Sequence, residues 1–405
     1  ARAAELSMPG RTPDLAELVG RHRILVCAGS GGVGKTTTAA AIALWGAMEG
    51  RRSIVLTIDP ARRLADSLGI GPIGNEPRLV PREVFSEIGL EVRGSLTAMM
   101  LDQKGSWDEL IERHAPNEEV RERILANRFY RQLSQSFAGS QEYMAVEQLG
   151  ELEASGEYDL IVVDTPPTQH ALDFLEAPDR LLAFLDRKIV KWFVRPSVSV
   201  GWSALQSMNR TVGFLLRKIE DATGVSALAE VSDFFDAMAG LFEGFEARVA
   251  RVTELLRDPA TAFVLVAGPD EQVLDQVEYL AAQMAARKMP LKGVVMNRVH
   301  ALSAQDGDAD ADAVTAAIAP LFQRGLTRLP PTSDGAAVLH RVAANFVGYQ
   351  ARARGDALRI ENFRHGLPSG VPLVQVPNLA RDIHDLAGLR ALHPHLFKRH
   401  RRVAA

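Results

Sequence analysis

The chain has 405 residues, of which 47% are hydrophobic and 24% are charged, a composition ordinary for a globular protein with a sizeable core. Its formal net charge of −4 gives no electrostatic reason to expect a nucleic-acid partner, so we expect none. The single cysteine, Cys27, excludes an intramolecular disulfide and a metal site built from several thiolates of one chain. Neither a secretory signal nor a membrane-spanning run of about 20 apolar residues is apparent. We therefore expect a cytoplasmic protein that is at most peripheral at a membrane.

Six short apolar runs rich in Val and Ile are typical of strands that are buried on both faces of a parallel sheet. They cover residues 23–28, 53–58, 159–164, 262–267, 292–297 and 372–377. Amphipathic helical patterns lie between them, for example at 36–48 and 271–287. This alternation predicts an α/β fold with a doubly wound, mainly parallel sheet.

Two intervals interrupt the alternation of strands and helices. Residues 95–153 and 181–256 carry helical periodicity without convincing strands, which predicts an α-helical subdomain inserted into a single α/β domain spanning 20–405. Residues 1–19 are then an N-terminal extension, and 397–405 form a short basic tail. We find no internal repeat, so we expect one nucleotide-binding unit rather than two in tandem.

A glycine-rich motif, "GSGGVGKT" at residues 29–36, fits the phosphate-loop pattern G-x-x-x-x-G-K-[ST] directly after a predicted strand and at the start of a predicted helix. Backbone amides of such a loop and the helix N-terminus bind the phosphates of ATP or ADP. The loop residues expected to do so are Gly29, Ser30, Gly31, Gly32, Val33 and Gly34. We expect Lys35 to reach the β and γ phosphates, Thr36 to ligate Mg²⁺ and Thr37 to donate to the α phosphate.

Two aspartates end neighbouring predicted strands. Asp164 closes the apolar run "LIVVD", where a carboxylate on the magnesium side of a nucleotide site is expected. Asp59 follows the run 53–58 and can orient or deprotonate an attacking water from the edge at which such sheets bind ligands. Considered alone, Asp59 would be better interpreted as a cap of the next helix. Next to a phosphate loop and Asp164, it is interpreted as catalytic and close to Mg²⁺.

Four segments in this order carry a family resemblance: "GGVGKTTTA", "TIDPARRLADSLG", "FAGSQEYMAVEQL" and "VDTPPTQHALDFLEAP". Together with "VMNRV" and "VPNLARDIHDLAGL", they resemble the arsenite-pump/Get3-type (ArsA/Get3) ATPases of the deviant Walker A class over most of residues 20–391. The resemblance implies a P-loop NTPase fold of the SIMIBI class. It also implies a dimer with nucleotides near the subunit interface, in which ATP hydrolysis is coupled to opening and closing of the two halves.

The resemblance also implies roles for single residues. Asp59 matches the switch I residue that positions the attacking water, and Asp164 matches the switch II residue on the magnesium side. Asn297 resembles an asparagine that reads adenine, since a carboxamide offers both a donor and an acceptor. Pro377 lies in a loop similar to one that packs on adenine. Asp270 falls where the family places an acid that contacts nucleotide across the dimer, or it is the N-terminal aspartate of a helix.

Three features depart from the family pattern. Ser30 stands where the class carries a signature lysine that reaches the partner subunit's phosphates and stabilises developing charge. The cysteines of a metalloid site are missing, as is a Cys-x-x-Cys zinc clasp. Because of Ser30, we expect either a homodimer or a heterodimer with a paralogous ATPase that carries the signature lysine.

These features predict a Mg²⁺-dependent ATPase that handles or targets a hydrophobic client or a membrane partner. The aromatic and Met-containing stretch at 181–224 is either a groove for an apolar helix or the packed core of the helical subdomain. One alternative function is the soluble motor of an anion (arsenite-like) efflux system. Another is a positioning ATPase similar to the MinD/ParA branch.

Overall fold

A twisted, mainly parallel sheet forms the centre of the molecule in the computed structural model, which describes residues 14–58, 63–101, 103–136, 140–166, 227–238, 242–303, 310–323 and 335–397. The strand order is β3-β4-β2-β5-β1-β6-β7-β8, and only the β3–β4 pair is antiparallel. The strands are β1 (Ile24–Gly29), β2 (Arg52–Thr57), β3 (Arg78–Leu79), β4 (Ser95–Met100), β5 (Leu160–Asp164), β6 (Thr261–Ala267), β7 (Leu291–Val299) and β8 (Leu373–Pro377).

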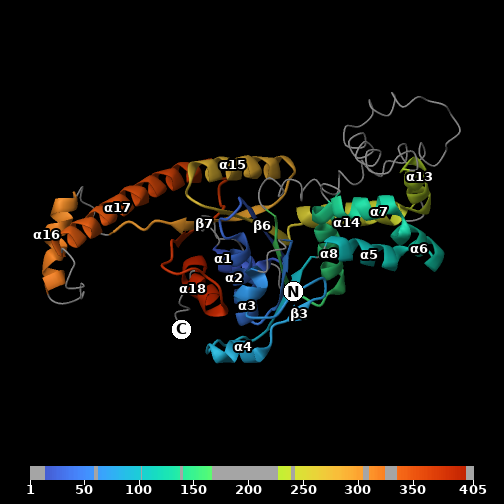
Figure 1. The fold of residues 1–405 in the computed structure, drawn as a ribbon, viewed down its shortest axis with the longest axis horizontal. Helices are drawn as coiled ribbons and strands as arrows, with labels where there is room; N and C mark the ends of the chain where they lie inside the picture. The colour runs from blue at the N-terminus through green and yellow to red at the C-terminus, as the bar shows by residue number, and fades with distance from the viewer. Residues whose placement is uncertain are drawn as a thin grey trace, which may run out of the picture.

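The described helices cover both faces of this sheet (Figure 1). They are α1 (Leu15–Arg21), α2 (Lys35–Met48), α3 (Arg63–Leu68), α4 (Arg82–Glu87), α5 (Gln103–His114), α6 (Glu118–Ala126), α7 (Arg128–Ser136), α8 (Ser140–Ser155), α13 (Ala227–Met238), α14 (Phe242–Arg257), α15 (Glu271–Ala286), α16 (Ala311–Gln323), α17 (Gly335–Gly366) and α18 (Leu386–Leu396). This arrangement confirms the predicted α/β class and all six predicted strands.

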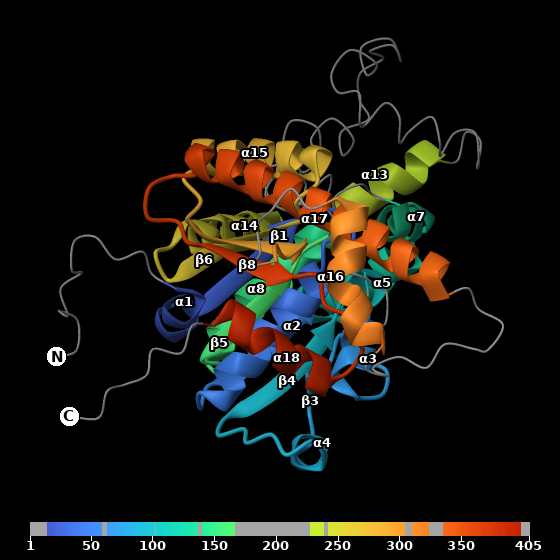
Figure 2. The ribbon, with the colours of Figure 1, turned by 90° about the vertical axis from the view of Figure 1, so that its left-hand side faces the viewer.

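Alternating side chains of the strands feed two separate hydrophobic cores, one on each face of the sheet. In β1, Ile24 and Val26 belong to the core under α8, α14 and α15, whereas Leu25 and Cys27 belong to the core under α1, α2 and α18. Figure 2 shows α15 lying alongside α17 above the sheet and α2 and α18 below it. The layers place the end of β1 and the start of α2 at the carboxyl edge of the sheet.

Residues 95–100 correct the sequence-based interpretation. This segment, expected within a helical region, is strand β4 and pairs in parallel with β2 over its whole length. Its Leu, Ala and Met residues favour helix intrinsically, so the strand arises from burial between β2 and the short β3 rather than from local propensity. Of the rest of the interval, the described residues form helices α5, α6, α7 and α8 with short connections between them, and no further strand.

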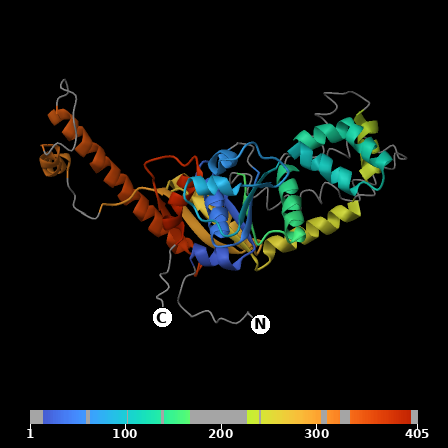
Figure 3. The ribbon, with the colours of Figure 1, turned by 90° about the horizontal axis from the view of Figure 1, so that it is seen from below.

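A group of helices stands at one end of the sheet, opposite the arm formed by α16 and α17 (Figure 3). It contains α5, α6, α7, α8, α13 and part of α14. Its described aromatic residues are packed inside: Phe129, Phe234 and Phe235 are buried, and the rings of Phe129 and Phe234 lie 5.2 Å apart. Residues 167–226, which include the whole of the predicted client-binding stretch at 181–224, lie outside the described residues.

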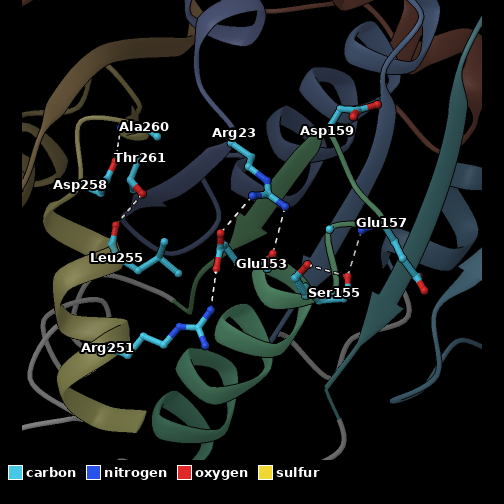
Figure 4. Close-up of polar contacts among 12 residues, drawn as sticks. Arg23, Glu153, Ser155, Glu157, Asp159, Arg251, Leu255, Asp258, Ala260 and Thr261 are labelled. Carbon is cyan, nitrogen blue, oxygen red and sulfur yellow. Dashed lines mark hydrogen bonds and ion pairs between the residues drawn. The ribbon is translucent and has the colours of Figure 1, made fainter. Parts of the chain in front are cut away.

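Polar contacts at the amino edge of the sheet attach this helical group to β1 (Figure 4). Arg23 donates to the Glu153 carboxylate and to the Glu153 carbonyl, each at 3.0 Å. Arg251 of α14 donates to the other carboxylate oxygen of Glu153 at 3.2 Å. Both α8 and α14 are thereby held at the edge opposite the phosphate loop. None of the described helices combines the length and apolar character needed to cross a membrane.

Candidate active site

The phosphate loop joins β1 to α2 through glycines that its backbone requires. Gly32 and Gly34 have φ angles of 74° and 93°, a region that residues with a side chain rarely adopt. A Cβ at Gly34 would also lie only 2.4 Å from Nδ2 of Asn297. The loop can therefore turn its backbone toward a ligand and accept Asn297 only because these positions lack side chains.

The side chains at the two ends of the loop make contacts within the protein. Nζ of Lys35, which is 7% exposed, donates to the carbonyl of Ser30 at 2.8 Å. The Ser30 hydroxyl donates to Oε1 of Gln276 on α15 at 3.0 Å. Position 30 is thus attached to a flanking helix, and Lys35, which is predicted to bind phosphate, contacts the backbone of the loop itself.

Asp164 accepts two hydroxyl hydrogen bonds at the end of β5. Oδ2 of Asp164 lies 2.6 Å from Oγ1 of Thr36 and 2.8 Å from Oγ1 of Thr57. The Asp164 side chain is fully buried, and burial together with this carboxylate raises the pKa of the neighbouring Cys27 thiol. Hydroxyl and carboxylate oxygens are the ligands that Mg²⁺ prefers, so the Thr36–Asp164 pair fits a magnesium ion beside the phosphates.

Asn297 connects the end of β7 to the phosphate loop. Its Nδ2 donates to the carbonyl of Val33 at 2.8 Å, and its Oδ1 accepts from the amide of Arg298 at 2.9 Å. One donor and one acceptor site of the carboxamide are therefore already used. The second N–H and the second lone pair remain for the adenine contact that the sequence predicts.

A cavity of about 700 Å³ opens at this edge of the sheet, within the usual size range of small-molecule sites. It is lined by Gly32, Gly34, Lys35, Thr36, Thr37, Asp66, Ser67, Thr165, Asn297, Arg298, Pro377, Asn378, Leu379, Arg381, Asp382, Ile383, His384 and Leu392. The start of α2 forms one wall, and the segment between β8 and α18 forms another. The predicted residues in this lining are Gly32, Gly34, Lys35, Thr36 and Thr37 of the phosphate loop and α2, Asn297 of β7 and Pro377 of β8, whereas Asp164 does not line the cavity but contacts Thr36.

Several cavity residues were not found by sequence reasoning. Arg298, Arg381, Asp382 and His384 lie within "VMNRV" and "VPNLARDIHDLAGL", two segments that carry the family resemblance, but the sequence assigned them no role of their own. Arg298 adjoins the predicted Asn297, which is the only sequence signal that could have drawn attention to it. The other three residues follow β8, and only the fold brings them opposite the phosphate loop.

Other predicted site residues lie elsewhere. Asp270 is exposed at the N-cap position of α15, makes no capping hydrogen bond through its side chain and does not line the cavity. Gly29, Ser30, Gly31 and Val33 form the loop behind the cavity wall rather than the lining. Asp59 lies outside the described residues. The catalytic role of Asp59 and the trans role of Asp270 stay predictions.

Comparisons with known proteins identify the family of the chain. The model of a family described as anion-transporting ATPase (ArsA) matches residues 22–316. An ATPase GET3 from Malassezia globosa is 26% identical over 278 residues, 68% of this chain and 72% of that protein. An ATPase ASNA1 homolog from Cryptosporidium parvum is 30% identical over 273 residues, 67% of this chain and 63% of that protein. The family match covers well over half of the chain and includes the phosphate loop, so this protein belongs to the anion-transporting (ArsA/Get3) ATPase family of ATP-hydrolysing enzymes.

Proposed function

We propose that the protein is a Mg²⁺-dependent ATPase that works as a dimer and converts ATP and water to ADP and phosphate. The observation that carries this proposal is the 2.6 Å contact between Thr36 and Asp164 beside the cavity. This contact supports the proposal because the Thr36 hydroxyl and the buried Asp164 carboxylate would together hold Mg²⁺. The bound ion would supply charge neutralisation for the β and γ phosphates.

Residues of the chain itself would bind the phosphates and the adenine and orient the attacking water. Lys35 leaves the Ser30 carbonyl and donates to the phosphates, and the first residues of α2, which line the cavity, offer their amides to the same phosphates. Asp59 orients the water that attacks the γ phosphorus, so that the bond to the β–γ bridging oxygen breaks and ADP leaves. Asn297 and Pro377 contact the adenine from the ends of β7 and β8.

Metal-dependent turnover of the purified protein tests this mechanism. We expect ATP hydrolysis with Mg²⁺ and none with EDTA, and we expect Asp164→Asn and Asp59→Asn each to lower kcat by about a hundredfold or more. Asp59→Asn should still bind ATP, because its carboxylate acts on water. Asp258→Asn, a remote exposed aspartate, is the matched control. Unchanged turnover in Asp59→Asn would remove that residue from catalysis, and metal-independent turnover would contradict the magnesium site.

We further propose that hydrolysis drives handling of a hydrophobic client. The resemblance to Get3-type ATPases and the large helical group beside the sheet support this role. The described aromatics of that group are packed inside, so they offer no client site, and the stretch 181–224 that we propose for this role lies outside the described residues. The lack of a metalloid cysteine set argues against the efflux-motor alternative.

One set of ATPase assays separates these functions. We expect an apolar helical peptide to bind the ATP-loaded protein and to change its turnover. Arsenite should leave turnover unchanged, as should DNA and anionic vesicles. Stimulation by arsenite would support the efflux motor instead, and stimulation by DNA or vesicles would support a positioning ATPase.

A further inference from the structure

The carboxyl end of β7 is irregular at the point where it reaches the cavity. Its pairing register with β8 shifts between Met296 and Val299, which is the pattern of a β-bulge. Within this bulge Arg298 adopts a φ of 59°, a left-handed conformation that costs a residue with a side chain about 1–2 kcal/mol. Bulges redirect side chains, and strained residues concentrate at functional sites.

Contacts of Asn297 fix this bulge against the phosphate loop. The carboxamide oxygen holds the Arg298 amide at 2.9 Å, and the carboxamide nitrogen holds the Val33 carbonyl at 2.8 Å. Arg298 therefore follows directly after a residue in contact with the loop that receives phosphates. Without the bulge, the regular alternation of β7 would continue through position 298, and its side chain would take a different direction.

The guanidinium of Arg298 is available to a ligand. Arg298 is exposed, lines the cavity, and has no ion pair or side-chain hydrogen bond with any residue that the structure describes. Lys35, in contrast, is buried and donates to the Ser30 carbonyl. A guanidinium can donate two parallel hydrogen bonds to a phosphate, which gives it more reach and specificity than a neutral donor.

We propose that Arg298 binds the phosphate groups of the nucleotide and supplies a cation to a site whose loop carries Ser30 in place of lysine. The proposal rests on the proposed nucleotide site, because the same cavity must receive ATP. On this proposal, the bulge and the strained backbone of Arg298 serve to direct the guanidinium toward the ligand, which a regular strand would not do.

Isothermal calorimetry can test the proposal by measuring the affinity of the protein for ATP, ADP and adenosine. A non-hydrolysable ATP analogue, titrated in parallel, checks that hydrolysis does not distort the value for ATP. We expect Arg298→Ala to bind ATP and ADP about tenfold more weakly, as for loss of a hydrogen bond to a charged group, with adenosine binding unchanged. Arg298→Lys should keep most of the ATP affinity. Arg298→Gly should lose it like Arg298→Ala although its backbone is relaxed, which separates the charge from the strain.

Lys288→Ala provides the matched control. Lys288 is exposed, basic and also at a φ of 59°, but it does not line the cavity, so its loss should leave ATP binding unchanged. Wild-type ATP affinity in a folded Arg298→Ala or Arg298→Gly variant would overturn the proposal, as would an equal loss of adenosine binding, which would place the guanidinium on the base. A wild-type protein that binds no nucleotide would instead contradict the proposed function itself.

Discussion

The hydrogen bond between Ser30 and Gln276 indicates which way a lysine side chain at position 30 would point. The hydroxyl of Ser30 is committed to α15, and the residue is 6% exposed. A longer, charged side chain could not stay in that contact and would turn outward from the loop. We expect such a side chain to reach the partner subunit's phosphates, as the family resemblance implies.

Replacing Ser30 tests whether the missing charge limits turnover. We expect Ser30→Lys to raise kcat of the purified protein by about tenfold or more, because a cation supplied in trans stabilises the charge of the transition state. Ser30→Ala is the matched control: it removes the hydrogen bond to Gln276 without adding charge and should leave kcat near the wild-type value. A fast wild-type enzyme that is indifferent to Ser30→Lys would show that no trans lysine, and no paralogous partner, is needed.

At the scale of secondary-structure elements, one buried carboxylate on α17 holds two loops of the cavity edge. Asp356, which is 3% exposed, accepts from the amide of His300 after β7 at 3.0 Å and lies 2.8 Å from Nδ1 of the same residue. Its other oxygen accepts from Arg359 at 2.7 Å. Arg359 in turn donates to the carbonyl of Pro269 after β6. The long helix therefore sets the positions of the strand ends that bear Asn297 and precede α15.

Removing this carboxylate should destabilise the protein. We expect Asp356→Ala to lower the free energy of unfolding by about 2–3 kcal/mol, because a buried acceptor of several hydrogen bonds is lost. The loss is not larger because Arg359, the charged partner left behind, is partly exposed and can be solvated. Denaturant titration followed by circular dichroism measures the change. Asp312→Ala removes the acid of an exposed pair with His340 and should change stability by less than about 0.5 kcal/mol. Equal effects in the two variants would contradict the role given to Asp356.

Helices and strands were predicted correctly where the local sequence pattern and the burial of the segment favour the same structure. The six Val- and Ile-rich runs are strands in the structure, and the phosphate loop lies between the first strand and helix as its motif requires. β4 was missed because its Met and Ala residues carry no strand signal, and only pairing with β2 settles its conformation. The loop after β8 was predicted at the nucleotide through Pro377, but the sequence did not single out Arg381, Asp382 and His384, because which side chains of the loop line the cavity depends on tertiary packing.

At the scale of the whole molecule, the C-terminal helix completes the core on one face of the sheet. Phe397, at the end of α18, stacks on Trp45 of α2 with ring centroids 4.4 Å apart. Nε2 of His393 lies 3.0 Å from the Ala41 carbonyl, a second contact between the same helices. Since α2 begins with Lys35 and Thr36, the last helix of the fold supports the element that carries the phosphate-binding residues.

Because α18 packs on α2 through Phe397, truncating this side chain should destabilise the protein. Phe397 is 2% exposed, so Phe397→Ala should lower the free energy of unfolding by about 3 kcal/mol through lost apolar contact and the cavity left beside Trp45. Leu358→Ala, at a side chain that is 66% exposed, should have little effect and serves as the control. Phe397→Leu should lose less than Phe397→Ala, because it fills part of the space. If denaturant titration shows Phe397→Ala as stable as Leu358→Ala, α18 does not hold α2 in place, and the nucleotide site does not depend on the C-terminal helix.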